Sequence, residues 1–258
     1  MPCIGWLVTS RDTTRPSLAA SALALAQLHA AGEVSSLLGA QGIRVLVLKG
    51  APFQDQYMHN PAAYLSVDLD LLLAPGDAPR ARELLRAAGW HEPADNNALF
   101  WRLSRSVNVQ RGDVVLDLHW GVHAGPLPSR AFDNLTAALW EHAEVTTGGW
   151  MTPGPEALFV YLGVHAAGHD HVEEKWVAGL RSVARHVRRW EQVDEIARSA
   201  RVTATVSWAR EVARGTDVEK PSQVLDGLTG ALRSLSWGGL RGHFIPRTRR
   251  DALKRRLR

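Results

Sequence analysis

The sequence predicts an α/β (α+β) fold, with a small mixed sheet in one domain and an α-helical domain after it. Two observations carry this prediction. Between residues 43 and 120, short runs rich in Leu and β-branched residues alternate with segments of helical spacing, as strands and helices do around one sheet. After Pro153 the strand pattern stops, and Gly and Pro separate segments of helical spacing. A content of 45% hydrophobic and 22% charged residues suits a globular chain.

The sheet domain is predicted element by element. Residues 17–41 have apolar side chains at helical spacing and predict two helices divided near Gly32. The run IRVLVLKG (43–50) is β-branched and ends in glycine, which predicts a strand and then a turn. Asp77 is a good N-cap and Gly89 a good C-cap for the second helix of the domain. The other predicted elements are a short helix at 51–58, a strand at 66–73, a helix at 75–90, a hairpin of 98–109 and 114–120, a helix at 129–143 and a short strand near 144–148.

The second domain is predicted to contain only helices. Gly and Pro mark the boundaries between its segments, and none shows the alternation of a strand. We therefore divide the chain into an N-terminal helical segment (1–42), a sheet domain (43–150), a helical domain (151–240) and a basic tail (241–258). The predicted helices of the second domain and its end are 154–171, 174–190, 191–201, 203–214 and 221–234.

Charge is concentrated at the C-terminal end. The tail 241–258 carries a net charge of +7, which leaves −3 over the remaining 240 residues of a chain whose total is +4. This distribution argues against a nucleic-acid-binding surface over the whole fold, although the tail itself suits nucleic acid. Cys3 is the single cysteine, so no internal disulfide can form and a reducing, cytoplasmic location is expected. No segment approaches the about 20 apolar residues of a membrane span.

The stretch YLSVDLDLLL (64–73) places two carboxylates inside a leucine-rich strand. Asp68 and Asp70 are two positions apart, so they would share one face of the strand, roughly 6–7 Å apart. Such charges are tolerable inside a fold only if a positive group lies between them. Asp117, in the strand VVLDLHW (114–120), adds a third carboxylate to the same sheet. Oxygen ligands suit Mg²⁺ or Mn²⁺, and two such ions can hold the oxygens of a phosphoryl transfer.

The turn after the first strand suggests a phosphate site. A strand that ends in Gly50 and leads into a helix directs backbone N–H groups and the positive end of the helix dipole at one point. Lys49 adds a positive charge there, in a chain that otherwise uses Arg and has four lysines. A solvated lysine at a strand end is the plain alternative.

Histidines near these motifs allow more than one interpretation. His119 shares a strand face with Asp117, which predicts a position beside the metal ligands. His165 and His169 are four residues apart on one helix, a spacing that can bind Zn²⁺. Packing, capping or a polar contact between the domains explains the pair as well, and we favour a structural or substrate-positioning role over zinc. Lys175 is expected on the helices that carry this pair.

Taken together, the segments VLKGA, SVDLDLLL and VVLDLHW resemble the nucleotidyltransferase superfamily that includes DNA polymerase β. The resemblance is closest to its poorly characterised bacterial branch and covers roughly residues 20–215. It implies an enzyme that transfers NMP from ATP or another NTP, with release of pyrophosphate. The acceptor would be a hydroxyl or similar group on a small molecule, peptide, protein or RNA.

The resemblance also implies roles for individual residues. Lys49 and Gly50, with Ser66, would bind the nucleotide, and Asp68 and Asp70 would bind Mg²⁺ or Mn²⁺. The same resemblance gives Asp117 two functions, to complete the metal site and to help activate the acceptor. Independently of the resemblance, we expect His119 beside the metal ligands, from its strand face, and the acceptor to enter over the helices that carry His165, His169 and Lys175.

Two positions depart from the family's pattern. Tyr64 stands where an Arg is common, and Ser182 where the helical domain often has an Asp. These departures keep open a second hypothesis, a catalytically altered binding or accessory protein in a modification pathway or partner-protein system. A third hypothesis, a His-based metal hydrolase, predicts bound zinc or iron.

Overall fold

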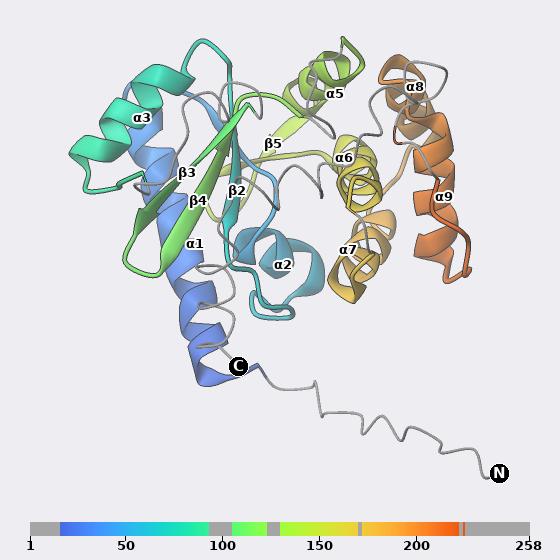
Figure 1. Cartoon of the computed structure of the whole chain (residues 1–258), viewed down its shortest axis with the longest axis horizontal. Coiled ribbons are helices and arrows are strands. Elements are labelled where there is room, and N and C mark those ends of the chain that lie inside the picture. The colour runs from blue at the N-terminus through green and yellow to red at the C-terminus, as the bar shows by residue number, and fades with distance from the viewer. Residues whose placement is uncertain (1–15, 93–104, 123–129, 170–171, 222–223, 225–258) are drawn as a thin grey trace, which may run out of the picture.

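Figure 1 shows the computed structural model of the chain, in which the described residues are 16–92, 105–122, 130–169, 172–221 and 224. Several predictions lie outside these residues and stay predictions. They are residues 98–104 of the predicted hairpin, nearly all of the helix at 221–234, the basic tail at 241–258 and Cys3.

Among the described residues, one mixed sheet contains the strands β1 (Val45–Val47), β2 (Leu69–Leu73), β3 (Ser106–Arg111), β4 (Val114–His119), β5 (Ala143–Val145) and β6 (Met151–Pro153). Their order across the sheet is β3-β4-β2-β1-β6-β5. The pairs β2–β4 and β1–β6 are parallel, whereas β1–β2, β3–β4 and β5–β6 are antiparallel. The predicted mixed sheet is confirmed.

Helices cover both faces of the sheet (Figure 1). Helices α1 (Leu18–Gly39) and α3 (Ala78–Ala87) lie against one face and share a hydrophobic core with it. The other face shares a second core with α2 (Ala51–Met58), α5 (Arg130–Glu141) and α6 (Pro155–Ala167). Helices α7 (Glu174–Ala184), α8 (Trp190–Ser199) and α9 (Thr203–Arg214) pack around α6 and complete the predicted helical part. The α/β fold class is confirmed.

Strand alternation assigns each position of the central strands to one core. In β2, Leu71 lies in the core with α1 and α3, whereas its neighbour Leu72 lies in the core with α5 and α6. In β4, Leu116 and Leu118 both lie on the side of α1 and α3. The residues between these leucines therefore face α2 and α6.

The prediction of two helices over 17–41 is wrong. Helix α1 runs unbroken through Gly32, where an added Cβ would meet nothing within 4 Å. Ala31 and Val34 on either side of it are buried against the sheet. Burial of this face outweighs the roughly 1 kcal/mol that glycine costs inside a helix. A local pattern does not contain that tertiary contribution.

The strand predicted at 66–73 begins only at Leu69, so Ser66 and Asp68 lie in the loop before β2. Backbone carbonyls of this loop accept hydrogen bonds from side chains instead of a neighbouring strand. Gln27 Nε2 donates to Ser66 O at 3.0 Å, and Ser66 Oγ donates to Asp68 O at 3.0 Å. These side-chain bonds compete with a strand ladder and end it early.

Strand β6 was not predicted, because three residues that include Pro153 carry no alternation. It forms through its parallel pairing with β1 and a hydrogen bond from Thr152 Oγ1 to Val47 O at 3.0 Å. Helix α7 ends at Ala184, earlier than the predicted 174–190. No helix in the described part of the chain is both long enough and apolar enough to cross a membrane.

Candidate functional site

Asp70 of β2 and Asp117 of β4 lie side by side on one face of the sheet. The two residues are direct partners in the parallel register of these strands. Because the flanking leucines point toward α1 and α3, both carboxylates face the opposite side, toward α6. The exposed fractions of Asp70 and Asp117 are 4% and 9%, so both charges are nearly removed from water.

Two basic side chains balance these carboxylates. Lys49 Nζ lies 3.0 Å from Asp70 Oδ1. His119 Nε2 lies 3.2 Å from Asp70 Oδ1 and 3.4 Å from Asp117 Oδ2. A positive group was expected between Asp68 and Asp70. In the structure an ammonium and an imidazole lie beside Asp70, and the imidazole also contacts Asp117.

The pKa values follow from competition between burial and charge. Burial by itself would lower the pKa of His119, but the charges and hydrogen bonds of Asp117 and Asp70 raise that pKa to about 9. Burial likewise opposes ionisation of Asp70, yet Lys49 and His119 hold the pKa of its carboxyl below the usual value. Near neutral pH the site thus holds ionised Asp70 beside a protonated imidazole.

The ligand chemistry of this group fits a divalent cation. One ligand atom from each of Asp70, Asp117 and His119 lies within 4.8 Å of the others, the only such cluster of three or more among the described residues. Carboxylate oxygens suit Mg²⁺ or Mn²⁺, whereas His119 would have to lose its proton before its imidazole could bind a metal. Asp68 is outside this group, so its role as a ligand stays a prediction.

Asp68 nevertheless lies on the same side of the sheet. Burial is the main reason that the pKa of Tyr161 is raised well above its ordinary value, and the charges of Asp70, Asp117 and Asp68 raise it further. Tyr161 of α6 is therefore close enough for the charge of each of the three carboxylates to raise its pKa. Its role was not predicted, although Tyr161 and His165 are four residues apart on α6. The predicted helix 154–171 ends earlier, at Ala167, so His169 lies just beyond it.

The two predicted histidines extend the polar network from the sheet into the helices. His165 Nε2 lies 3.1 Å from Lys49 Nζ and 3.3 Å from His169 Nε2. The ring of His169 stacks at a tilt on Trp176 of α7, with 4.2 Å between centroids. Within the described residues no third metal-binding donor joins this histidine pair, and its role stays a prediction.

The Lys49–Gly50 turn needs glycine for two reasons. Gly50 has φ 101° and ψ −165°, a region that essentially only glycine occupies. A Cβ at this position would lie 3.0 Å from Leu69 Cδ1 and 3.3 Å from Asp68 O. The turn is thus packed directly against the start of β2, and Gly50 is the N-cap of α2.

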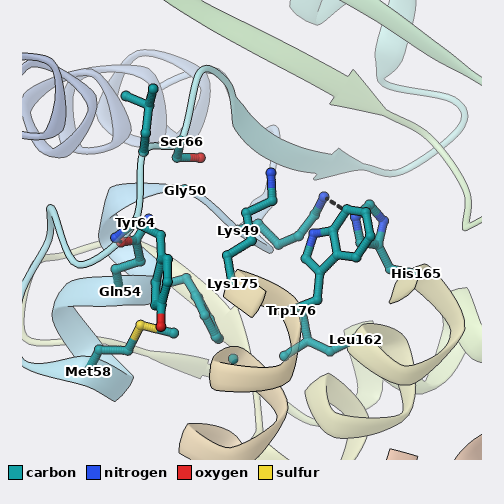
Figure 2. Close-up of a pocket in the computed structure, with 13 residues that line it drawn as sticks. Lys49, Gly50, Gln54, Met58, Tyr64, Ser66, Leu162, His165, Lys175 and Trp176 are labelled. Carbon is teal, nitrogen blue, oxygen red and sulfur yellow. Dashed lines mark hydrogen bonds between the residues drawn. The ribbon is translucent and has the colours of Figure 1, made fainter. Parts of the chain in front are cut away.

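A pocket between α2 and the helices α6 and α7 brings the predicted nucleotide residues together (Figure 2). Lys49, Gly50 and Ser66 line it, and so do His165 and Lys175 from the helical part. Its apolar wall consists of Phe53, Met58, Leu65, Leu162 and Trp176, with Tyr64 beside them. The three aspartates, His119 and His169 are not part of the lining. Asp70 contacts the lining residue Lys49, and His169 contacts the lining residue His165.

Other predicted residues have simpler surroundings. Lys175 is one-third exposed and lies 3.0 Å from Glu173 Oε2, with its ammonium 5.4 Å from the ring centre of Trp176. Ser182 is buried in α7, where its Oγ accepts a hydrogen bond from Arg185 Nη2 at 3.1 Å. It is not among the residues that line the pocket.

Residues 11–215 match the profile of a protein family described as "Uncharacterised nucleotidyltransferase". No curated protein gives a significant match. The solution structure of the antibiotic-resistance factor ANT(2'')-Ia is similar with a TM-score of 0.44 and 11% identity, over 73% of this chain and 95% of that chain. The crystal structure of ANT(2'')-Ia in complex with adenylyl-2''-tobramycin has a TM-score of 0.48 and 14% identity, over 68% of this chain and 97% of that chain.

Proposed function

The chain belongs to the family of uncharacterised nucleotidyltransferases, and we propose that it transfers NMP from an NTP to a hydroxyl or similar acceptor with Mg²⁺ or Mn²⁺ bound. The observation that carries this proposal is the pair Asp70 and Asp117, placed in register on one face with Lys49 Nζ 3.0 Å from Asp70. Burying two carboxylates side by side is costly for a fold and has a chemical use in a nucleotidyltransferase.

The carboxylates are proposed to hold the metal. Asp70 and Asp117 would bind it, with Asp68 from the loop before β2 and His119 beside them. When bound, a divalent cation neutralises charge on the phosphates and orients the attacking and leaving oxygens. The donor set fits such an ion, because the carboxylates of Asp70 and Asp117 are adjacent and the pKa of Asp70 is held below its usual value.

The nucleotide is proposed to lie in the pocket of Figure 2. Its lining includes the ammonium of Lys49, and the Gly50 turn leads into α2 with the positive end of the helix dipole. Lys49 lies between Asp70 and this pocket, so its side chain can exchange the carboxylate for a phosphate oxygen by a small rotation. Ser66 lines the same pocket.

The acceptor would enter from the side of α6 and α7, past His165, His169 and Lys175. Its hydroxyl oxygen forms a bond to the α-phosphorus while the bond from that phosphorus to pyrophosphate breaks. The hydroxyl proton passes to Asp117, the carboxylate we propose as its acceptor. Catalysis then comes from positioning and from charge neutralisation around the phosphates. Small molecules, peptides, proteins and RNA all present such a hydroxyl.

Thermal unfolding with each of the four NTPs and Mg²⁺ or Mn²⁺ tests nucleotide binding. Wild type should be stabilised by at least one NTP, and Asp70→Asn and Asp117→Asn should lose that shift. Asp194→Asn is the control, because Asp194 is half-exposed and pairs with Arg210 at 2.7 Å on the far helices. A wild-type protein indifferent to every NTP with either metal contradicts the proposal.

Transfer itself requires a second measurement. Each α-labelled NTP is incubated with the enzyme, Mg²⁺ or Mn²⁺ and cell extract, and the label is traced to its acceptor. Label should appear in an acceptor with wild type and not with Asp70→Asn. Binding of an NTP without any label transfer would instead favour the accessory-protein hypothesis.

A further inference from the structure

We propose that Gln27 of α1 is a positioning residue that joins the Lys49–Gly50 turn to the loop carrying Ser66 and Asp68, and thereby sets the affinity for NTP. This inference rests on the proposed function for its nucleotide. It concerns a residue of the segment 1–42, which the sequence separated from the catalytic domain.

The side-chain amide of Gln27 is fully buried, with an exposed fraction of 0%. Its Oε1 accepts a hydrogen bond from the N–H of Ala51 at 2.9 Å, and its Nε2 donates to Ser66 O at 3.0 Å. One partner is a donor and the other an acceptor, so only one orientation of the amide satisfies both. Gln27 therefore bridges two backbone segments that are 15 residues apart.

Each segment carries part of the proposed site. Ala51 is the first residue of α2 and follows Gly50, whose missing Cβ would lie 3.3 Å from Gln27 Oε1. On the other side, Ser66 Oγ donates to Asp68 O at 3.0 Å. The amide thus connects the phosphate-facing turn with the loop that leads into the carboxylate strand β2.

No regular strand or helix holds this loop. Residues 60–68 contain no helix or strand, and Leu69 begins β2. A second glutamine fixes the loop's other end, because Gln54 Oε1 of α2 accepts a hydrogen bond from the N–H of Tyr64 at 2.7 Å. With few backbone partners available, the position of Ser66 and Asp68 depends on these side-chain amides.

Loss of the bridge should act on the site more than on the fold. Removing the amide leaves the buried N–H of Ala51 and the partly buried carbonyl of Ser66 without their partner. These two backbone groups can regain hydrogen bonds, for example with water, if the turn and the loop move apart. Phosphate and metal sites tolerate only about 0.5 Å of such movement before binding suffers.

The test compares Gln27→Met, which keeps the side-chain length and removes both hydrogen bonds, with Gln27→Glu, which keeps an acceptor for Ala51 N–H. Thr205→Val is the matched control. Thr205 of α9 is also 0% exposed, and its Oγ1 donates to a backbone carbonyl, Val224 O, at 2.8 Å. All variants are full-length chains, with thermal unfolding used to match their loss of stability.

Two readouts separate positioning from stability. Titration calorimetry gives the affinity for the NTP that stabilises wild type most, with Mg²⁺ present. Amide hydrogen exchange of the free protein follows peptides that cover residues 49–54 and 62–70. Gln27→Met should weaken NTP binding about tenfold or more and should speed exchange in both peptides. The free-energy cost of one buried polar group without a hydrogen-bond partner corresponds to about a tenfold change in affinity. Gln27→Glu should speed exchange mainly in 62–70.

Thr205→Val should leave NTP affinity and exchange in both peptides at wild-type values, even at equal loss of stability. Equal affinity in Gln27→Met and Thr205→Val overturns the inference. If wild type binds no NTP, the proposed function fails. Amide hydrogen exchange then tests by itself whether Gln27 holds the turn and the loop together. Faster exchange in both peptides of Gln27→Met then supports it, and unchanged exchange overturns it.

Discussion

Replacing Gly50 by alanine should be strongly destabilising. Alanine is strained at the backbone angles of this turn, and the turn has no room for its Cβ. At φ 101° and ψ −165° an L-residue is strained by about 1–3 kcal/mol. The new Cβ would lie 3.0 Å from Leu69 Cδ1 and 3.3 Å from the backbone oxygen of Asp68. Leu69 is fully buried, so crowding adds about 1–3 kcal/mol.

The two effects together lower the free energy of unfolding by about 2–6 kcal/mol. For a chain of this length that corresponds to a fall in Tm of about 5–20 °C. Gly32→Ala is the matched control, because Gly32 lies inside α1 and an added Cβ there meets nothing within 4 Å. This control should gain about 0.5–1 kcal/mol from helix propensity.

Circular dichroism during heating measures both variants, and NTP-induced stabilisation of any folded Gly50→Ala protein measures the site. If Gly50→Ala has the same Tm as Gly32→Ala, or binds NTP as tightly as wild type, the reasoning about the turn is refuted. A Gly32→Ala protein that loses stability would contradict the single unbroken α1.

The remaining predictions concern the charges at the site. His119 has a folded pKa of about 9, above its unfolded value of about 6.5, so its protonation stabilises metal-free protein fully below about pH 6.5 and this contribution is lost as pH rises to about 9. In urea unfolding with EDTA, the free energy of unfolding of wild type should therefore fall by up to about 3 kcal/mol more than that of His119→Asn between these pH values. The same pH dependence in both proteins would contradict this assignment of the pKa. Lys49→Met leaves buried Asp70 without its ammonium and should lower the free energy of unfolding by about 3–5 kcal/mol in the same assay. Lys175→Met breaks a partly exposed pair with Glu173 and should cost less than about 1 kcal/mol, so equal losses in the two lysine variants would argue against burial as the cause.

Local patterns in the sequence predicted the parts of the fold that depend on neighbouring residues. Helix α2 has the predicted bounds 51–58, and Gly89 follows α3 with φ +84°, as a helix-ending glycine should. The alternation of leucine with aspartate in β2 and β4 placed Asp70 and Asp117 on the non-leucine face. These features are set within a few residues of chain, where periodicity and caps act.

The same patterns failed where distant segments compete. The alternation that correctly placed Asp70 also put Asp68 in the strand, but side-chain hydrogen bonds from Ser66 and Gln27 hold that residue in a loop. Strand β6 exists because β1 offers a free edge to three residues that have no pattern of their own. Gly32 predicted a break between two helices, but burial of the helix against the sheet keeps α1 continuous.

The sequence by itself predicted three aspartates in the sheet, of which Asp70 and Asp117 do lie there. It also indicated that such carboxylates need a positive partner, since burying like charges is costly whatever the fold. Only the tertiary structure decided which groups supply that charge. Lys49 comes 21 residues before Asp70 in the chain and His119 comes 49 residues after it, yet both lie within 3.2 Å of its Oδ1. Gln27, in the first helix, comes 22 residues before Lys49. Such contacts depend on how elements pack, and no local spacing records them.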